Sequence, residues 1–160
     1  MKRILLISDT HGKIENLEKI LSAVSFDAVL HMGDIGRQED EIQKLVSPKP
    51  VDIVRGNCDL FSDATDKLVT SFEKVTVFST HGHIYGVNYG LDRLIYAASE
   101  AGASVVIYGH THVPLVTYEN GILIVNPGSL SRPLQVGGHP TYAVLTIDGD
   151  KADAEIFEVQ

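Results

Sequence analysis

The sequence predicts a single α/β domain over residues 1–160, and three observations support this class. The first third of the chain alternates apolar runs with amphipathic segments, which is the pattern of a β-α-β-α-β unit. Such crossovers favour parallel strands with right-handed connections. The remainder is richer in short strands. No internal repeat, low-complexity segment or shift in composition marks a boundary between domains.

The β-α-β-α-β unit begins with a strand at Lys2–Ile7, in which residues 4–7 are a continuous apolar run typical of a strand buried on both faces. An amphipathic helix follows, with apolar residues at helical spacing at Ile14, Leu17, Leu21 and Val24. A second strand at Ala28–His31 precedes a short helix at Glu39–Val46. That helix ends at Ser47-Pro48-Lys49-Pro50, because proline cannot continue the hydrogen-bond ladder. Residues 51–54 form the third strand.

The rest of the chain is expected to supply most of the strands. They are predicted at residues 68–72, 74–79, 104–108, 115–118, 122–125, 142–147 and 152–159. Asn120-Gly121 and Asp148-Gly149 are hairpin signals between strand pairs. One further helix is indicated by the spacing of Leu91, Leu94, Ile95 and Ala98, and it stops near Gly102.

Composition argues against several classes of protein. A formal net charge of −8 opposes tight, sequence-independent binding to nucleic acid. No segment approaches the roughly 18 consecutive apolar residues of a membrane span, and the apolar run after Met1-Lys2-Arg3 is shorter than the 7 to 15 residues, roughly, of a signal peptide. The single cysteine, Cys58, excludes an internal disulfide. We therefore expect a cytoplasmic protein with no membrane partner; association of identical copies stays open.

Residues that can bind metal ions or take part in catalysis follow the apolar runs, one group after each run. They occur in Asp9-Thr10-His11, Gly33-Asp34, Gly56-Asn57-Cys58-Asp59, His81-Gly82-His83, Gly109-His110-Thr111-His112 and Asn126-Pro127-Gly128-Ser129. Taken singly, several of these are ordinary turn sequences. Two imidazoles one residue apart after an apolar run, at His110 and His112, are harder to explain by packing. Nitrogen and oxygen donors without paired cysteines suit divalent Mn, Fe, Ni, Co or Zn. Together the motifs predict ligands for two metal ions.

This ordered set resembles the calcineurin-like metallophosphoesterase superfamily, and its short form is similar to the small prokaryotic phosphodiesterases of that superfamily. The resemblance runs from Asp9 to Ser129. It implies a two-sheet β-sandwich flanked by helices, a four-layer α/β/β/α fold, with two divalent ions at one edge. Manganese is the expected ion, with Ni, Co, Fe or Zn as alternatives. By motif position, Asp34 would bridge the ions, and the remaining ligands would be Asp9, His11 and His112 for the first ion and Asn57, His81 and His110 for the second.

The implied activity is hydrolysis of a small-molecule phosphodiester by a metal-bound hydroxide that Asp34 helps to hold. Metal coordination can lower the pKa of water from 15.7 to about 7, so no serine or cysteine nucleophile is required. Two divalent ions, less the charges of Asp9, Asp34 and the hydroxide, leave about one positive charge. That charge balances a diester better than a monoester. Cys58 stands where the wider superfamily often has a histidine, so the source of the leaving-group proton stays open.

His83, Cys58 and Arg132 are the candidates for contact with the substrate. His83 is equally explained as a turn histidine, and Cys58 is expected to pack against the substrate or its neighbours rather than to act as a nucleophile. Arg132 and Arg55 suit bidentate recognition of phosphate, but each is equally explained as a solvated surface arginine.

Four further polar residues near these motifs have structural explanations. His31 is expected to be a core histidine with satisfied hydrogen bonds, and His139 to lie in an exposed loop between glycine and proline. Asp59 and Ser129 are expected to stabilise the turns around their neighbours. None of the four is counted as a metal ligand.

Two other functions stay open at this stage. The same ligands could serve a phosphomonoesterase or nucleotide phosphatase. The chain could also be a catalytically silent interaction scaffold, like the retromer subunit of this superfamily, in which the metal site is degraded. The intact ligand set argues against the scaffold.

Overall fold

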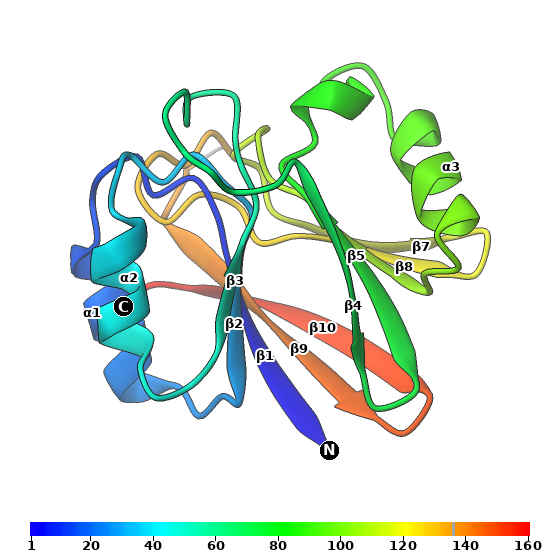
Figure 1. Cartoon of the computed structure of the whole chain (residues 1–160), viewed down its shortest axis with the longest axis horizontal. Helices are drawn as coiled ribbons and strands as arrows, with labels where there is room; N and C mark the ends of the chain where they lie inside the picture. Colours follow the sequence, from blue (N-terminus) through cyan, green and yellow to red (C-terminus); the bar gives the residue numbers. More distant parts are fainter. Residues whose placement is uncertain (136) are drawn as a thin grey trace.

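Two five-stranded sheets pack face to face, with helices on their outer faces, in the computed structural model of the chain (Figure 1). The structure describes residues 1–135 and 137–160. The first sheet has the strand order β10-β9-β1-β2-β3 and the second the order β4-β5-β6-β8-β7. The α/β class and the four-layer sandwich that the resemblance implies are therefore confirmed.

The expected β-α-β-α-β unit forms half of the first sheet. Strands β1 (Lys2–Ile7), β2 (Ala28–His31) and β3 (Val51–Ile53) are parallel neighbours. Helices α1 (Glu15–Ala23) and α2 (Glu39–Val46) connect them and lie on the outer face of this sheet (Figure 1). Because all three strands run the same way, their carboxyl ends meet at one edge of the sheet.

The second sheet mixes parallel and antiparallel pairs. Its strands are β4 (Lys67–Phe72), β5 (Val75–Thr80), β6 (Val105–Ile107), β7 (Leu115–Glu119) and β8 (Ile122–Asn126). Strand β6 runs parallel to both β5 and β8, whereas β4 and β7 are antiparallel edge strands. The β7–β8 hairpin turns at Asn120 and Gly121, as predicted, and both residues have positive φ, as a type I′ turn requires.

The remaining elements complete the four layers. Helix α3 (Asp92–Glu100) covers the outer face of the second sheet, and strands β9 (Thr141–Asp148) and β10 (Lys151–Glu158) form an antiparallel pair beside β1 (Figure 1). One short 3-10 helix, η1 (His83–Tyr85), was not predicted. None of the helices among the described residues is long and apolar enough to cross a membrane.

Strand β1 shows why residues 4–7 of its sequence are all apolar. Ile4 and Leu6 point into the layer between the two sheets, whereas Leu5 and Ile7 point towards α1 and α2. All four side chains are fully buried. Burial of each such side chain stabilises the fold by about 1.5–3 kcal/mol. The strand is thus held on both faces, and this anchors the loop that follows it.

Candidate metal centre

All seven expected metal ligands lie in loops that follow strands at one end of the sandwich (Figure 1). The loop after β1 carries Asp9 and His11, and the loops after β2, β3 and β5 carry Asp34, Asn57 and His81. His110 and His112 follow β6. These five strands belong to two different sheets, so the packing of the sheets brings the ligand loops together.

Glycine allows these loops to approach one another closely. A Cβ at Gly56 would collide with the Asp34 carboxylate and backbone, and a Cβ at Gly109 would collide with the side chains of Ser8 and Asp9. The glycine that precedes Asn57 and the one that precedes His110 are therefore required by steric contact between loops.

The backbone is strained at most of the expected ligands. Positive φ occurs at eight non-glycine residues among those described, and five of them are expected ligands, namely Asp9, His11, Asp34, His110 and His112. Residues held in this region cost of order 1–3 kcal/mol each, and they cluster at active sites and ligand clamps. The concentration of strain here supports a functional centre.

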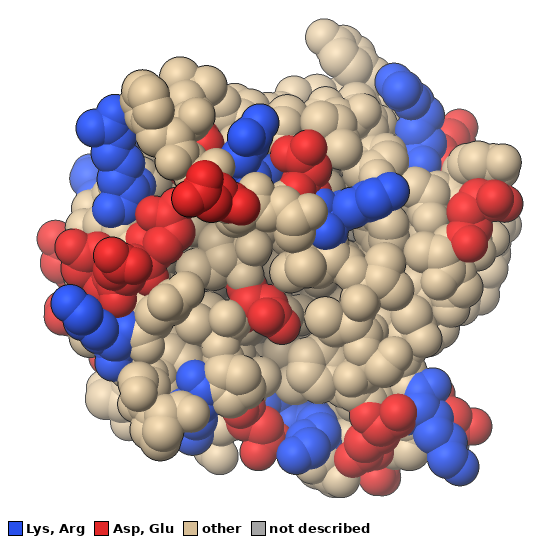
Figure 2. All heavy atoms as spheres, viewed as in Figure 1, with Lys and Arg blue, Asp and Glu red and all other residues tan. Residues whose placement is uncertain are grey.

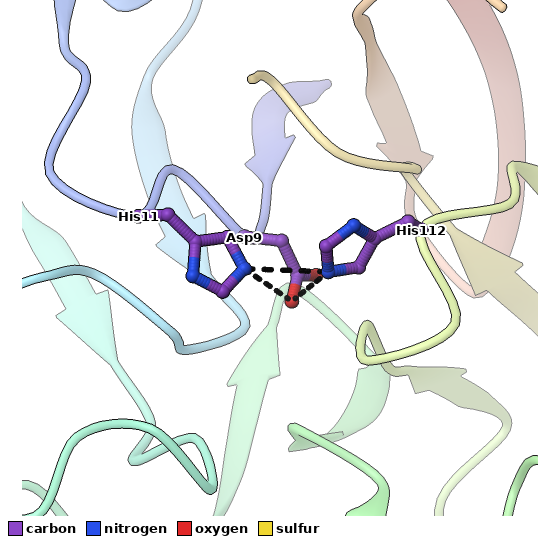
Figure 3. A group of neighbouring side chains, drawn as sticks. All are labelled: Asp9, His11 and His112. Carbon is purple, nitrogen blue, oxygen red and sulfur yellow. Dashed lines mark hydrogen bonds and ion pairs between the residues drawn. The ribbon is translucent and has the colours of Figure 1, made fainter. Parts of the chain in front are cut away.

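Asp9, His11 and His112 form one group of potential ligands (Figure 3). The Nε2 atom of His112 lies 3.2 Å from Oδ1 of Asp9, and the Nε2 atoms of His11 and His112 are 3.3 Å apart. Asp9 is completely buried, and its Oδ1 receives no hydrogen bond from any described residue. A buried carboxylate oxygen without a donor is costly unless a cation neutralises it. This oxygen is therefore suited to a metal ion.

Asn57, His81 and His110 form a second group. The Oδ1 atom of Asn57 lies 3.0 Å from Nε2 of His81 and 3.0 Å from Nδ1 of His110. The Oδ2 atom of Asp34 lies 3.3 Å from Nε2 of His81 and 3.8 Å from Nε2 of His11, so this carboxylate stands between the two groups. These positions agree with the expected ligand sets, and the roles of the individual residues stay predictions.

Backbone carbonyls orient two of the histidines. His81 Nδ1 lies 2.6 Å from the carbonyl of Met32, and His112 Nδ1 lies 2.7 Å from the carbonyl of Arg132. A carbonyl accepts only, so each Nδ1 carries a proton and donates it. In the neutral imidazole, Nε2 then presents its lone pair to the carboxylates. Such pairing is typical of metal-binding histidines.

The carboxylates and imidazoles of the centre shift one another's pKa values. Burial disfavours the imidazolium of His81, but Asp34 and Asp9 outweigh burial and raise its pKa. The carboxylate of Asp9, whose Oδ1 lies 3.2 Å from Nε2 of His112, is the main cause of the raised pKa of His112. Burial lowers the pKa of His11 and of His110, which favours the neutral form of these rings. Protons and a divalent cation would thus compete for the same positions beside Asp9 and Asp34.

The candidates for substrate contact lie around this centre. The ring of His83 is 5.4 Å from that of His81, and its buried Nδ1 receives no hydrogen bond from the described residues. Cys58 is exposed, and its backbone N–H donates to Oδ1 of Asp34 at 2.8 Å. Burial and the charge of Asp34 raise the pKa of its thiol, which disfavours a thiolate nucleophile. Arg132 reaches His112 through its carbonyl, and its side chain is exposed.

Asp59 does more than stabilise its own turn, because it also binds the backbone of a second loop. Its buried carboxylate accepts hydrogen bonds from the N–H groups of Asp34 at 2.7 Å, Gly56 at 2.9 Å and Ile35 at 2.9 Å. It therefore joins the loop after β2 to the loop after β3. The Gly-Asn-Cys-Asp motif contained this residue, but nothing in the motif indicates that it contacts the loop of Asp34.

His31 is buried with both ring nitrogens paired, as expected. Gly33 N–H donates to Nδ1 at 3.0 Å, so Nε2 carries the proton and donates to Oγ1 of Thr10, also at 3.0 Å. Burial lowers the pKa of His31 to about 4. The neutral ring thus links the loop of Asp9 to the loop of Asp34.

Three other residues support the ligand loops. Ser129 Oγ donates to the carbonyl of Asp9 at 2.8 Å, which agrees with its expected role in a turn. Asn126 donates to the carbonyl of Gly109 at 3.0 Å. The amide of Asn88 lies 3.0 Å from Nε2 of His110. No sequence signal pointed to Asn88.

Two other residues considered in the sequence lie at the surface. His139 is exposed, as expected, and Arg55 forms a surface ion pair with Asp66 at 3.6 Å.

Comparison with known proteins places this centre in a family context. Residues 1–150 match the family model described as the calcineurin-like phosphoesterase superfamily domain. The chain is 33% identical to the probable metallophosphoesterase YsnB of Bacillus subtilis over 158 residues, which cover 97% of this chain and 90% of that protein. It is 27% identical to the phosphodiesterase YfcE of Escherichia coli over 176 aligned positions, covering 92% of this chain and 89% of that protein.

A solved structure with a similar fold comes from Streptococcus pneumoniae, where the protein is described as a predicted phosphoesterase. Its sequence is 31% identical, and the TM-score is 0.86. The match covers 98% of this chain and 89% of that chain. Sequence and fold thus agree over nearly the whole length.

Proposed function

This chain belongs to the calcineurin-like phosphoesterase superfamily, and from that premise we propose that it is a phosphodiesterase that depends on two divalent metal ions. Membership makes the chain a metal-dependent phosphoesterase; the preference for diesters and the assignment of each ligand are the proposal. The observation that carries it is the buried Oδ1 of Asp9, which receives no hydrogen bond from the residues that the structure describes and faces the Nε2 atoms of His11 and His112.

The residues divide into three roles in this proposal. Asp9, His11 and His112 would hold one ion and Asn57, His81 and His110 the other, and Asp34, which stands between the two groups, would serve both. Two ions in these positions would lower the pKa of water from 15.7 to about 7 and offset charge on the phosphoryl oxygens. The carbonyls of Met32 and Arg132 accept the Nδ1 protons of His81 and His112, so in the neutral rings the Nε2 lone pairs are available to an ion. His83 stands beside the second group, where it can contact a phosphoryl oxygen.

Charge supports a diester as the substrate. Only Asp9 and Asp34 among the proposed ligands carry a negative charge, so two divalent ions and a hydroxide leave about one positive charge. Asp59 adds a negative charge nearby, and Arg132 adds a positive charge that acts on His11, so the two offset each other. The phosphate of a diester has a single negative charge, which this centre balances.

Chelation with metal analysis tests the proposal. Removing metal should abolish hydrolysis of bis(p-nitrophenyl) phosphate, and adding Mn, Ni or Co should restore it, because activation of the nucleophile is assigned to the ions. Undiminished turnover in protein that elemental analysis shows to be free of metal would refute this mechanism. A protein that binds two ions but never turns over any ester would instead be a scaffold.

The monoester alternative needs a matched pair of substrates. p-Nitrophenyl phosphate and bis(p-nitrophenyl) phosphate share a leaving group and differ in charge. A higher kcat/KM for the monoester would overturn the preference for diesters. The location in the cytoplasm, the identity of manganese as the native ion, the single domain over 1–160 and association of copies stay predictions with this proposal.

A further inference from the structure

A hollow of about 200 Å³ opens beside the metal centre, between the loop that follows β3 and the residues that lead into α2. Cys58 lines this hollow, and its Sγ lies within 4.8 Å of ligand atoms of His11 and Asp34. Sites for whole small molecules usually measure about 300–1,000 Å³. The hollow is therefore sized for one group of a substrate whose phosphate reaches the metal centre.

Two apolar side chains stand exposed at the wall of the hollow. Leu60 is 76% exposed and Phe61 is 78% exposed. Single exposed apolar residues are ordinary on protein surfaces. Here the two are consecutive, and they follow the proposed ligand Asn57 after only two residues. Their exposure next to the metal centre is explained if a ligand covers them.

Arg37 gives the wall a defined geometry. Its guanidinium lies 4.8 Å from the centre of the Phe61 ring, within the range of a cation–π contact. The contact restrains the ring, while most of the Phe61 side chain, which lines the hollow, stays exposed. Glu39 and Ser62 add polar groups to the same hollow. Stacking surfaces of aromatic rings and guanidinium planes, with polar groups at the edge, are what proteins use to bind nucleobases.

We propose that Phe61 and Arg37 form a subsite that stacks the base of a nucleotide phosphodiester, an inference that rests on the proposed diesterase function. The base would occupy the hollow while the phosphodiester reaches Asp34 and the other ligands past Cys58. Glu39 would accept a hydrogen bond from an N–H group of the base, either a ring N–H or an amino group. The chemistry thus selects a nucleoside as one of the two ester groups.

The charge around the hollow favours a small nucleotide over a polynucleotide. Figure 2 shows acidic side chains gathered on the flank of the molecule where α1 and α2 lie. The first turn of α2 contains Glu39, Asp40 and Glu41, and the whole chain has a net charge of −8. A long polyanion that passed this flank would meet like charges at each phosphate. The proposed ligand has one nucleoside and one phosphodiester.

Two diesters with the same leaving group measure the contribution of the base. Thymidine 5′-(p-nitrophenyl phosphate) carries a base, and methyl p-nitrophenyl phosphate carries none. Stacking on one aromatic side chain is worth a factor of about 5 to 150 in binding. Phe61→Ala should therefore lower kcat/KM for the thymidine ester by about this factor relative to the methyl ester. Tyr96→Ala, which removes another exposed aromatic ring on α3, should leave the ratio unchanged. An unchanged ratio in Phe61→Ala overturns the subsite.

A fluorescence measurement tests the subsite without turnover. The chain contains no tryptophan, so Phe61→Trp introduces the only one, at the subsite, and its emission can be excited apart from that of the six tyrosines. Adenosine 5′-monophosphate should quench it at lower concentration than ribose 5-phosphate, because only the nucleotide has a base to stack. The control Tyr96→Trp, at a side chain that is 68% exposed, should show no such difference.

The two measurements separate failure of the subsite from failure of the proposed function. Diester hydrolysis with no effect of the base in either measurement overturns the subsite alone. Base-dependent quenching in a protein that hydrolyses no diester overturns the proposed function and keeps the subsite. Tighter quenching by a single-stranded oligonucleotide than by the mononucleotide overturns the choice of a small ligand.

Discussion

Replacing Asp59 with asparagine should weaken both the fold around the metal centre and its affinity for metal. The carboxylate accepts three short hydrogen bonds, two at Oδ2 from Asp34 and Gly56 and one at Oδ1 from Ile35. Asparagine has one acceptor oxygen, and its amide nitrogen donates. Whichever way the amide turns, at least one buried backbone N–H then faces a donor.

The cost follows from the number of hydrogen bonds changed. One buried N–H left without an acceptor costs about 1–3 kcal/mol, and loss of the charge weakens each remaining bond by about 1 kcal/mol. The free energy of unfolding should therefore fall by roughly 2–5 kcal/mol. For a chain of this size, about 2–4 °C of Tm is lost per kcal/mol, so Tm should fall by roughly 5–15 °C. Affinity for metal should fall by about 10- to 100-fold, since such supporting contacts typically contribute that much.

Thermal unfolding of the metal-free protein and calorimetric titration with Mn²⁺ measure the two effects separately. Asp63→Asn is the matched control, because Asp63 is exposed in the same loop and loses the same charge. We expect it to leave both quantities nearly unchanged. Equal Tm values in the two variants would refute the stability argument. Lower stability with unchanged affinity for Mn²⁺ would show that Asp59 does not position the ligand loops.

Three further measurements address the centre and its support. Asp34→Asn should lower kcat/KM more than His83→Ala, because Asp34 stands between both ligand groups; the reverse order would mean that its bridging role is wrong. Cys58→Ser should keep both metals and most activity, and loss of turnover with the metals bound would show that the thiol takes part. In the wild type, diesters whose leaving groups have a low pKa should react faster than alkyl diesters. Cys58→His should reduce this difference in rate if the imidazole reaches the leaving group. Burial lowers the pKa of His31 from 6.5 to about 4. Between these two pH values His31 is protonated in the unfolded chain but neutral in the folded chain. The free energy of unfolding of metal-free protein should then fall by about 3 kcal/mol between pH 6.5 and 4, measured by urea unfolding, and an identical pH dependence in His31→Gln would contradict this.

Local patterns predicted most of the individual elements. The apolar run at β1, the proline end of α2 and the Asn120-Gly121 turn each depend on neighbouring residues, so the sequence alone indicates them. The packing of a second sheet on the first was expected only from the resemblance to a family, because periodicity along a strand does not say what lies on either face. The short helix at His83–Tyr85 was missed, since it lies between two glycines in a segment with no helical period.

The supporting residues of the centre could not be predicted because their contacts join distant parts of the chain. Asp59 binds the backbone of Asp34, and His31 binds Thr10. Asn88 reaches His110 from a loop with no recognisable motif. Left-handed backbone at the ligands is equally hidden, because aspartate and histidine adopt positive φ only where surrounding loops hold them there.

The sequence by itself determined the α/β class, the order of the candidate ligands along the chain, and the donor chemistry that suits two divalent ions. Only the tertiary structure decided which atoms of these residues face the centre. The Nε2 atoms of His81 and His112 point inward because their Nδ1 protons go to the carbonyls of Met32 and Arg132, which lie 49 and 20 residues away. Packing of the two sheets brings those carbonyls to the histidines, so the state of each ring is a property of the assembled fold.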